Sequence, residues 1–211
     1  MAIVWPCPLS VDAYVAAGRR AEFPRPDCPS CGGPLVFWSG YRRHVRAGGR
    51  CRKIFVPRLR CGRCRVTHAL LPAFVLAWRL DAVEAIGMVI GGVAGGTSGV
   101  RPAAALLGIP YTTARGWCRR FGARAPRLGV AFAALAAELG GEPVRPAADA
   151  GAFALAAIGA AFGAASCLPG WLALGAWRFA SAVSGGKLIA ANIISPWLIV
   201  GRRRFMPPVP P

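Results

Sequence analysis

Residues 28–64 read CPSCGGPLVFWSGYRRHVRAGGRCRKIFVPRLRCGRC, with one Cys-x-x-Cys pair at the start, Cys28 and Cys31, and a second at the end, Cys61 and Cys64. A two-residue gap lets both sulfurs of a pair reach one metal ion from a single tight turn. Four thiolates are also a ligand set that suits tetrahedral Zn²⁺. The four cysteines are therefore the predicted ligands of one Zn²⁺ ion.

The residues between the two pairs favour a β-hairpin. Leu35 to Ser39 and Cys51 to Leu59 are rich in β-branched and aromatic residues, and Ala47-Gly48-Gly49-Arg50 supplies a turn between them. A hairpin whose two ends are held by one metal ion is a zinc ribbon. The sequence predicts such a ribbon over residues 28–72.

Alternative interpretations of the cysteines stay open. The gap between the pairs is longer than the usual 15 to 20 residues, and the cysteines could form disulfides or be free core thiols. The first eighteen residues lack a basic segment and carry Pro6, Pro8 and Asp12 where a secretion signal needs an apolar core. A reducing cytosol is therefore expected, and it favours a metal over disulfides. Three other residues are rival ligands: Cys51, His44 and His68.

The charge of the chain indicates a polyanionic partner. Subtracting 8 acidic from 26 basic residues gives +18, and residues 28–80 contain 11 Lys or Arg and no Asp or Glu. A GC-rich gene would explain why 24 of the 26 basic residues are Arg, but it would not remove the carboxylates. Double-stranded DNA is the predicted partner. In the ribbon, the predicted phosphate contacts are Arg42, Arg43, Arg52 and Lys53.

Residues 73–125 are predicted to form three helices. The first spans 81–93, with Asp81 as its N-cap and Glu84 completing a capping box. The second spans 100–107 and stops at Gly108, a residue suited to the left-handed conformation that ends many helices.

The third helix, 111–121, is basic on its outer side. It turns Ala114 and Trp117 inward, and its outward residues are the predicted DNA contacts Thr112, Thr113, Arg115, Arg119 and Arg120.

The run AAALLGIPYTTARGW, residues 103–117, resembles a helix-turn-helix, with Gly108 in the turn. A zinc ribbon followed by such a unit resembles the N-terminal DNA-binding region of insertion-sequence transposases and a related family of uncharacterised proteins from GC-rich genomes. The likeness spans residues 28–124 and, weakly, 177–192. The resemblance implies that the first outward residues of the third helix approach base edges and that Arg119 and Arg120 lie nearer phosphates.

The rest of the chain is apolar and poor in charge. Residues 126–200 are rich in Ala and Gly, and helices are predicted at 128–139, 149–166 and 171–183. These helices are expected to pack together and could form a homodimer. Residues 1–27 are expected to be a loose lead-in, and residues 201–211 a basic, proline-rich tail.

A membrane span over residues 150–168 is the main alternative for this region, because its 19 residues carry no charge. Only five of them are Leu, Ile, Phe or Val, the residues that favour insertion, and the next apolar run carries Arg178. A buried helical pack is therefore preferred. The alternative function is a membrane-associated protein with a basic zinc-ribbon head and an apolar C-terminal anchor.

No catalytic constellation is recognisable in the sequence. After Arg124 the acidic residues are Glu138, Glu142 and Asp149, too close together for the separated carboxylates that hold two Mg²⁺ ions in a transposase. The prediction is a cytoplasmic, non-enzymatic, zinc-containing DNA-binding protein. Its expected fold is mostly α with a small β zinc ribbon: a ribbon hairpin, a three-helix helix-turn-helix and Ala-rich C-terminal helices.

Overall fold

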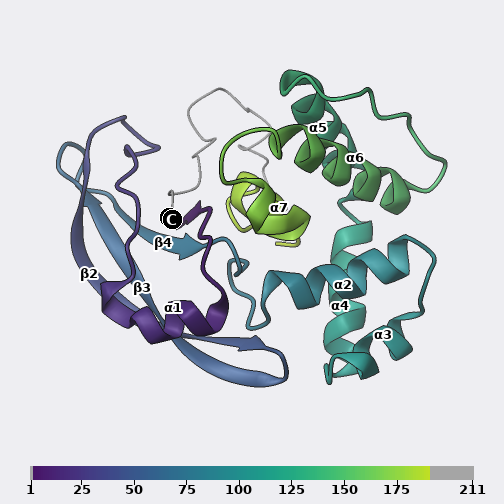
Figure 1. Ribbon diagram of the computed structural model, residues 1–211, viewed down its shortest axis with the longest axis horizontal. Helices are drawn as coiled ribbons and strands as arrows, with labels where there is room; N and C mark the ends of the chain where they lie inside the picture. The colour runs from purple at the N-terminus through teal and green to yellow at the C-terminus, as the bar shows by residue number, and fades with distance from the viewer. Residues whose placement is uncertain (1, 191–211) are drawn as a thin grey trace.

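The computed structural model describes residues 2–190 and shows a β-sheet on one side of the molecule and a layer of helices on the other (Figure 1). Within residues 2–190, 44% of the residues are helical and 21% are in strands, with a four-stranded mixed sheet and seven helices. The prediction of a mostly α protein with a small ribbon and a three-helix unit was therefore wrong. The protein has a mixed α/β fold.

The four strands form a sheet in the order β1-β4-β3-β2. The strands are β1 (Ala2–Trp5), β2 (Leu35–Ala47), β3 (Arg50–Cys61) and β4 (Thr67–Pro72). β1 pairs parallel to β4, whereas β2–β3 and β3–β4 are antiparallel. The predicted hairpin exists, and it is long: its register runs from Leu35 opposite Cys61 to Ala47 opposite Arg50. Gly48 and Gly49 close it at φ of 54° and 72°, angles that suit glycine.

The N-terminal segment is not a loose lead-in. After β1, helix α1 (Val11–Ala17) begins at Ser10, whose hydroxyl accepts a hydrogen bond from the backbone N–H of Ala13. α1 lies across the sheet (Figure 1), and its Tyr14 donates a hydrogen bond from its hydroxyl to the Phe55 carbonyl at 3.0 Å. Tyr14 is buried with Trp5 and Phe74 in the core of the sheet. This short segment therefore completes the hydrophobic core that a hairpin alone would lack.

The helical segments predicted from sequence are helical, with ends shifted by a few residues. They are α2 (Val83–Ala94), α3 (Val100–Leu106), α4 (Tyr111–Gly122), α5 (Ala125–Glu138), α6 (Ala150–Ala165) and α7 (Gly175–Val183), the last preceded by the short η2 (Leu172–Leu174). Their buried residues belong to one continuous core that runs from Leu76 to Ala190. α2, α3 and α4 are therefore part of a larger helical layer and do not form a separate three-helix domain.

α7 joins the two layers, because it lies between the sheet and the other helices (Figure 1). Arg178 forms an ion pair with Glu84 of α2 and donates hydrogen bonds to the backbone carbonyls of Cys7 and Leu9. The buried hydroxyl of Ser181 donates to the carbonyl of Val75 at 3.0 Å. These contacts fix the helical layer against the sheet.

Asp81 does not cap α2 as predicted. The N-cap residue is Ala82, and no side chain caps the helix. Asp81 instead binds Arg46 of β2 through two hydrogen bonds, Nε to Oδ1 at 2.6 Å and Nη2 to Oδ2 at 3.1 Å. The side chain of Arg46 reaches Asp81 because the hairpin extends alongside the segment that enters α2, a contact that local sequence spacing does not reveal.

Between residues 2 and 190, no helix has the length and apolar character needed to cross a membrane. The anchor proposed as the alternative for residues 150–168 therefore has no support from the fold. The predicted basic tail, 201–211, lies outside the described residues.

Candidate metal centre

The two Cys-x-x-Cys pairs form two turns with the same hydrogen-bond pattern. In the first, the N–H of Cys28 donates to the carbonyl of Gly33 and the N–H of Gly32 donates to the carbonyl of Cys28, each at 2.8 Å. In the second, Cys61 donates to Val66 at 2.9 Å and Arg65 donates to Cys61 at 3.1 Å. The equivalent bonds place the two sulfur pairs in equivalent positions.

Each turn depends on a left-handed residue directly after its second cysteine. In the first turn this residue is Gly32 at φ 70°, which costs a glycine little. In the second it is Arg65 at φ 64°, an uncommon conformation for a residue with a side chain. Gly62, the glycine inside the second pair, does not take a positive φ. The glycines of the sequence therefore did not indicate that Arg65 is the left-handed residue of the second turn.

The four cysteine sulfurs come together at one point between β3 and the segment before β2. All four lie within 4.8 Å of one another; this group, Cys28, Cys31, Cys61 and Cys64, is called the cysteine cluster. The Sγ atoms of Cys28 and Cys64 are 3.6 Å apart, and those of Cys31 and Cys61 are 3.4 Å apart. A disulfide needs about 2.05 Å, and all four thiols are free.

These distances fit a single metal ion. Zinc–sulfur bonds of about 2.3 Å in a tetrahedron place the sulfurs about 3.8 Å apart, which lies between the closest pairs and the 4.8 Å limit of the cluster. Gly33 keeps the site narrow: a Cβ at this position would lie 3.1 Å from Cys61 Sγ and 2.9 Å from the Cβ of Arg63. The cysteine cluster could therefore hold a metal ion.

Backbone amides prepare the Cys61 sulfur to bind a cation. The N–H groups of Arg63 and Cys64 lie 3.3 and 3.4 Å from Cys61 Sγ and donate to it. The hydrogen bond from Cys64, opposed by burial and helped by the one from Arg63, lowers the pKa of the Cys61 thiol to about 6. Because the thiolate is the form that binds metal, this turn favours the ligand state near neutral pH.

Of the three rival ligands, only His68 lies at the cluster. His68 is buried in β4, and its Nε2 is 3.4 Å from Cys28 Sγ. Burial lowers the pKa of His68, so its neutral imidazole can donate one hydrogen bond to the sulfur. His44 is exposed opposite Lys53, and Cys51 is exposed near the hairpin tip opposite Arg46. The sequence identified His68 as a rival ligand but not as a partner of the Cys28 sulfur.

We predict that His68→Phe weakens zinc binding about 10- to 100-fold without changing the number of ions bound, because it removes a hydrogen bond that orients a ligand sulfur. Competition with a chromophoric chelator would measure the affinity. His44→Phe, at the exposed histidine of β2, is the matched control and should bind zinc like the wild type. A changed thiolate-to-metal absorption in cobalt-substituted His68→Phe would instead make His68 a direct ligand.

The four basic residues predicted in the hairpin have different surroundings. Arg42 and Lys53 are exposed. Arg43 is half-buried, and its guanidinium donates to the carbonyls of Leu76 and Arg79 at 2.6 and 2.5 Å. Arg52 forms an ion pair with Asp12 of α1 at 2.7 Å. Arg42 and Lys53 are therefore free of the intramolecular contacts that engage Arg43 and Arg52.

Helix α4 has the predicted two-sided character. Its buried residues are Ala114, Trp117 and Phe121. The exposed positions include Thr112, Arg115 and Arg119, whereas Thr113 and Arg120 are half-buried. Spacings of three and four residues place Thr112, Arg115 and Arg119 on one side of the helix. Gly108, between α3 and α4, takes the predicted left-handed conformation at φ 61°.

A family model described as a domain of unknown function, DUF6431, matches residues 28–104. The match begins at the first cysteine of the cluster and ends in α3, and it covers less than half of the chain. Nothing among curated proteins or solved structures matches the chain. The matched region includes all four cysteines, but the description of the family carries no activity or ligand.

Proposed function

We propose that this protein is a zinc-containing, non-catalytic DNA-binding protein that contacts duplex DNA through α4 and the basic β2–β3 hairpin. The observation that carries the DNA proposal is the exposed side of α4, with Thr112, Arg115 and Arg119 on one face. The proposed metal is Zn²⁺, because a closed set of four thiolates suits structural zinc. The role of the metal is to hold the two cysteine turns at the base of the hairpin.

The charge around α4 supports a polyanionic partner. Residues 85–137 contain six arginines and no Asp or Glu. Arg101 of α3 lies over the ring of Tyr111 at 4.7 Å, so a further cation stands at the start of α4. In the view of Figure 1, the hairpin tip and the α3–α4 end of the helical layer both lie at the lower edge of the molecule.

Arg120 has a different environment from Arg115. It lies across Gly116, where a Cβ would be 2.9 Å from its Nη1. Burial lowers the pKa of the nearby Arg79, and the positive charge of Arg120 lowers it further. Two neighbouring guanidinium groups repel each other, and a phosphate between them would relieve that repulsion. Arg120 is thus a phosphate contact in the proposed complex, and Arg115 a contact to a base edge.

Arg115→Ala is expected to weaken binding to a selected DNA site by about 1 to 3 kcal/mol and to relax the preference at one base pair, if Arg115 pairs with a guanine. Arg120→Ala should weaken all duplexes alike and reduce the salt slope by about one unit. Selection from a random duplex pool, followed by titration of each variant across salt concentrations, would measure both effects.

The hairpin arginines supply a matched pair of controls. Arg42→Ala should behave like Arg120→Ala, because Arg42 is exposed. Arg43→Ala should mainly lower stability, because its guanidinium binds two backbone carbonyls. If no sequence is enriched and the Arg115 and Arg120 variants respond identically to salt and sequence, recognition by α4 is excluded.

We also propose that the protein is related to the DNA-binding region of insertion-sequence transposases. A second part of the proposal is that the C-terminal helices form a homodimer. Val130 of α5 and Leu172 of η2 are exposed apolar side chains on the helical layer, and a second copy could cover them. Sedimentation of the purified protein would test the dimer.

A further inference from the structure

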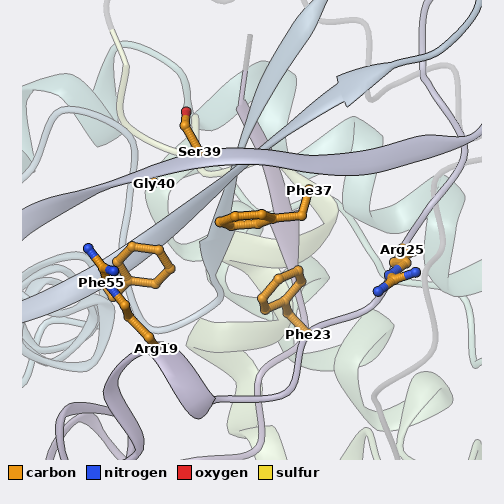
Figure 2. Close-up of a pocket in the computed structure, with 7 residues that line it drawn as sticks. All are labelled: Arg19, Phe23, Arg25, Phe37, Ser39, Gly40 and Phe55. Carbon is orange, nitrogen blue, oxygen red and sulfur yellow. The ribbon is translucent and has the colours of Figure 1, made fainter.

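A pocket of about 590 Å³ opens on the sheet where η1 (Gly18–Arg20) and the segment after it pass over β2 and β3 (Figure 2). Three phenylalanines, Phe23, Phe37 and Phe55, form its apolar walls, and Arg19 and Arg25 are its charged residues. None of the residues that line it is acidic. The metal centre and α4 contribute none of its lining residues.

The aromatic rings of the pocket are available to a planar ligand. The centroids of Phe23 and Phe37 are 6.3 Å apart with their planes 37° from parallel. Phe37 is 51% exposed, which leaves a large apolar ring in contact with water. Gly40 has no side chain, and this allows the ring of Phe55 to lie against β2, because a Cβ there would be 2.1 Å from Phe55 Cζ. One wall of the pocket is thus an aromatic face held close to the backbone.

The two arginines lie on either side of the phenylalanines. In Figure 2, Arg19 is next to Phe55 at one end and Arg25 is at the other. The guanidinium carbon of Arg19 is 5.4 Å from the centre of the Phe55 ring. Both arginines are exposed, and the three ion pairs found in residues 2–190 involve other arginines. An anionic group could approach either guanidinium without displacing a carboxylate.

Further basic side chains follow the hairpin away from the pocket. Phe55 is directly opposite Arg42, and Lys53 is opposite His44 two residues further along β2. Alternate residues of a strand lie on one face, so Arg42 and Lys53 share the face that carries Phe55. The pocket therefore stands at one end of a row of cations, the arrangement that a chain of phosphates with an unstacked base requires.

We propose that this pocket binds an unpaired nucleotide of a single-stranded nucleic acid, with its base against Phe37 and its flanking phosphates near Arg19 and Arg25. Every base has an aromatic face, so such a site tolerates many sequences. The proposal is independent of duplex binding by α4, because no residue of α4 lines the pocket.

The test is equilibrium binding of the zinc-loaded full chain to a fluorescent oligothymidylate of about eight nucleotides, a length typical of such sites. Phe37→Ala should weaken binding roughly 5- to 100-fold, as expected for the loss of one stacked base. Arg19→Gln and Arg25→Gln should each weaken it and reduce its salt dependence. Trp78→Ala removes another exposed aromatic residue that is outside the pocket, and it should leave binding unchanged.

Further probes separate this proposal from its rivals. Tighter binding of an oligouridylate would support the site and identify RNA as its source of nucleotides, whereas thymidine monophosphate binding as tightly as the oligomer would overturn a strand-binding site. Arg115→Ala should spare oligothymidylate binding, and Phe37→Ala should spare duplex binding. Equal loss of both ligands in Phe37→Ala, with an unchanged unfolding temperature, would contradict a separate pocket, and so would wild-type oligothymidylate binding by Phe37→Ala.

Discussion

The Cys28→Ser/Cys61→Ser variant is expected to retain no zinc, whereas the wild type should carry about one ion per chain. The variant removes one sulfur from each turn, and two remaining thiolates cannot close a tetrahedral site. A ligand that binds only the folded state stabilises it by about 4 kcal/mol when its free concentration is a thousand times Kd. The variant should therefore lose at least about this much stability in zinc-containing buffer. Elemental analysis and thermal unfolding with and without a chelator would measure both quantities.

The exposed cysteines provide the control for this experiment. Cys51→Ser and Cys167→Ser remove thiols that lie outside the cysteine cluster, and both variants should keep the metal and the unfolding temperature of the wild type. Full zinc retention in the Cys28→Ser/Cys61→Ser variant would rule out the proposed centre. Loss of zinc with no change in stability would make the ion incidental to folding.

Arg46→Met is expected to destabilise the protein by about 3 to 5 kcal/mol, because it leaves the carboxylate of Asp81 without its partner. Asp81 is 4% exposed and receives two hydrogen bonds from Arg46. The pair also connects the hairpin with the start of α2. Chemical unfolding monitored by tryptophan fluorescence would give the change in free energy.

A second arginine of the hairpin makes this prediction specific. Arg52 also binds an aspartate, but the side chain of that partner, Asp12, is 76% exposed. Arg52→Met should therefore cost no more than about 1 kcal/mol. The double variant Arg46→Met/Asp81→Asn, which removes the buried charge together with its partner, should recover part of the lost stability. Equal effects of Arg46→Met and Arg52→Met would show that burial of the carboxylate is not the cause.

Local signals in the sequence predicted the local structure well. The Cys-x-x-Cys spacing placed the two turns, the double glycine at 48–49 placed the hairpin tip, and apolar periodicity placed α4 with Ala114 and Trp117 inward. Each of these signals depends on residues close together in the chain. The sequence also predicted that all four sulfurs lie close together, because a hairpin brings its two ends together.

The contacts that the sequence did not reveal are those between distant segments. β1 consists of four apolar residues before a proline, too short a run to indicate a parallel partner 67 residues later in β4. Asp81 and Glu84 have the spacing of a capping box, but Asp81 binds Arg46 and the N-cap of α2 is Ala82. His68 belongs to β4, and the strand pairing with β3 places it beside the cysteines. The fold class was mispredicted because such pairings leave no periodic pattern in a single sequence.

The contact between Arg178 and the N-terminal segment has a consequence for how the chain is made. The carbonyls of Cys7 and Leu9 accept hydrogen bonds from a residue 171 and 169 positions away. A growing chain leaves the ribosome N-terminus first, so β1 and α1 emerge long before α7 is synthesised. Closing so large a loop is slow. Until α7 has been made, the apolar residues of β1 lack the contacts that α7 provides in the folded protein. The packing of β1 is therefore expected to be completed only after α7 has been made, and a chain cut short before α7 would present that surface to chaperones and proteases.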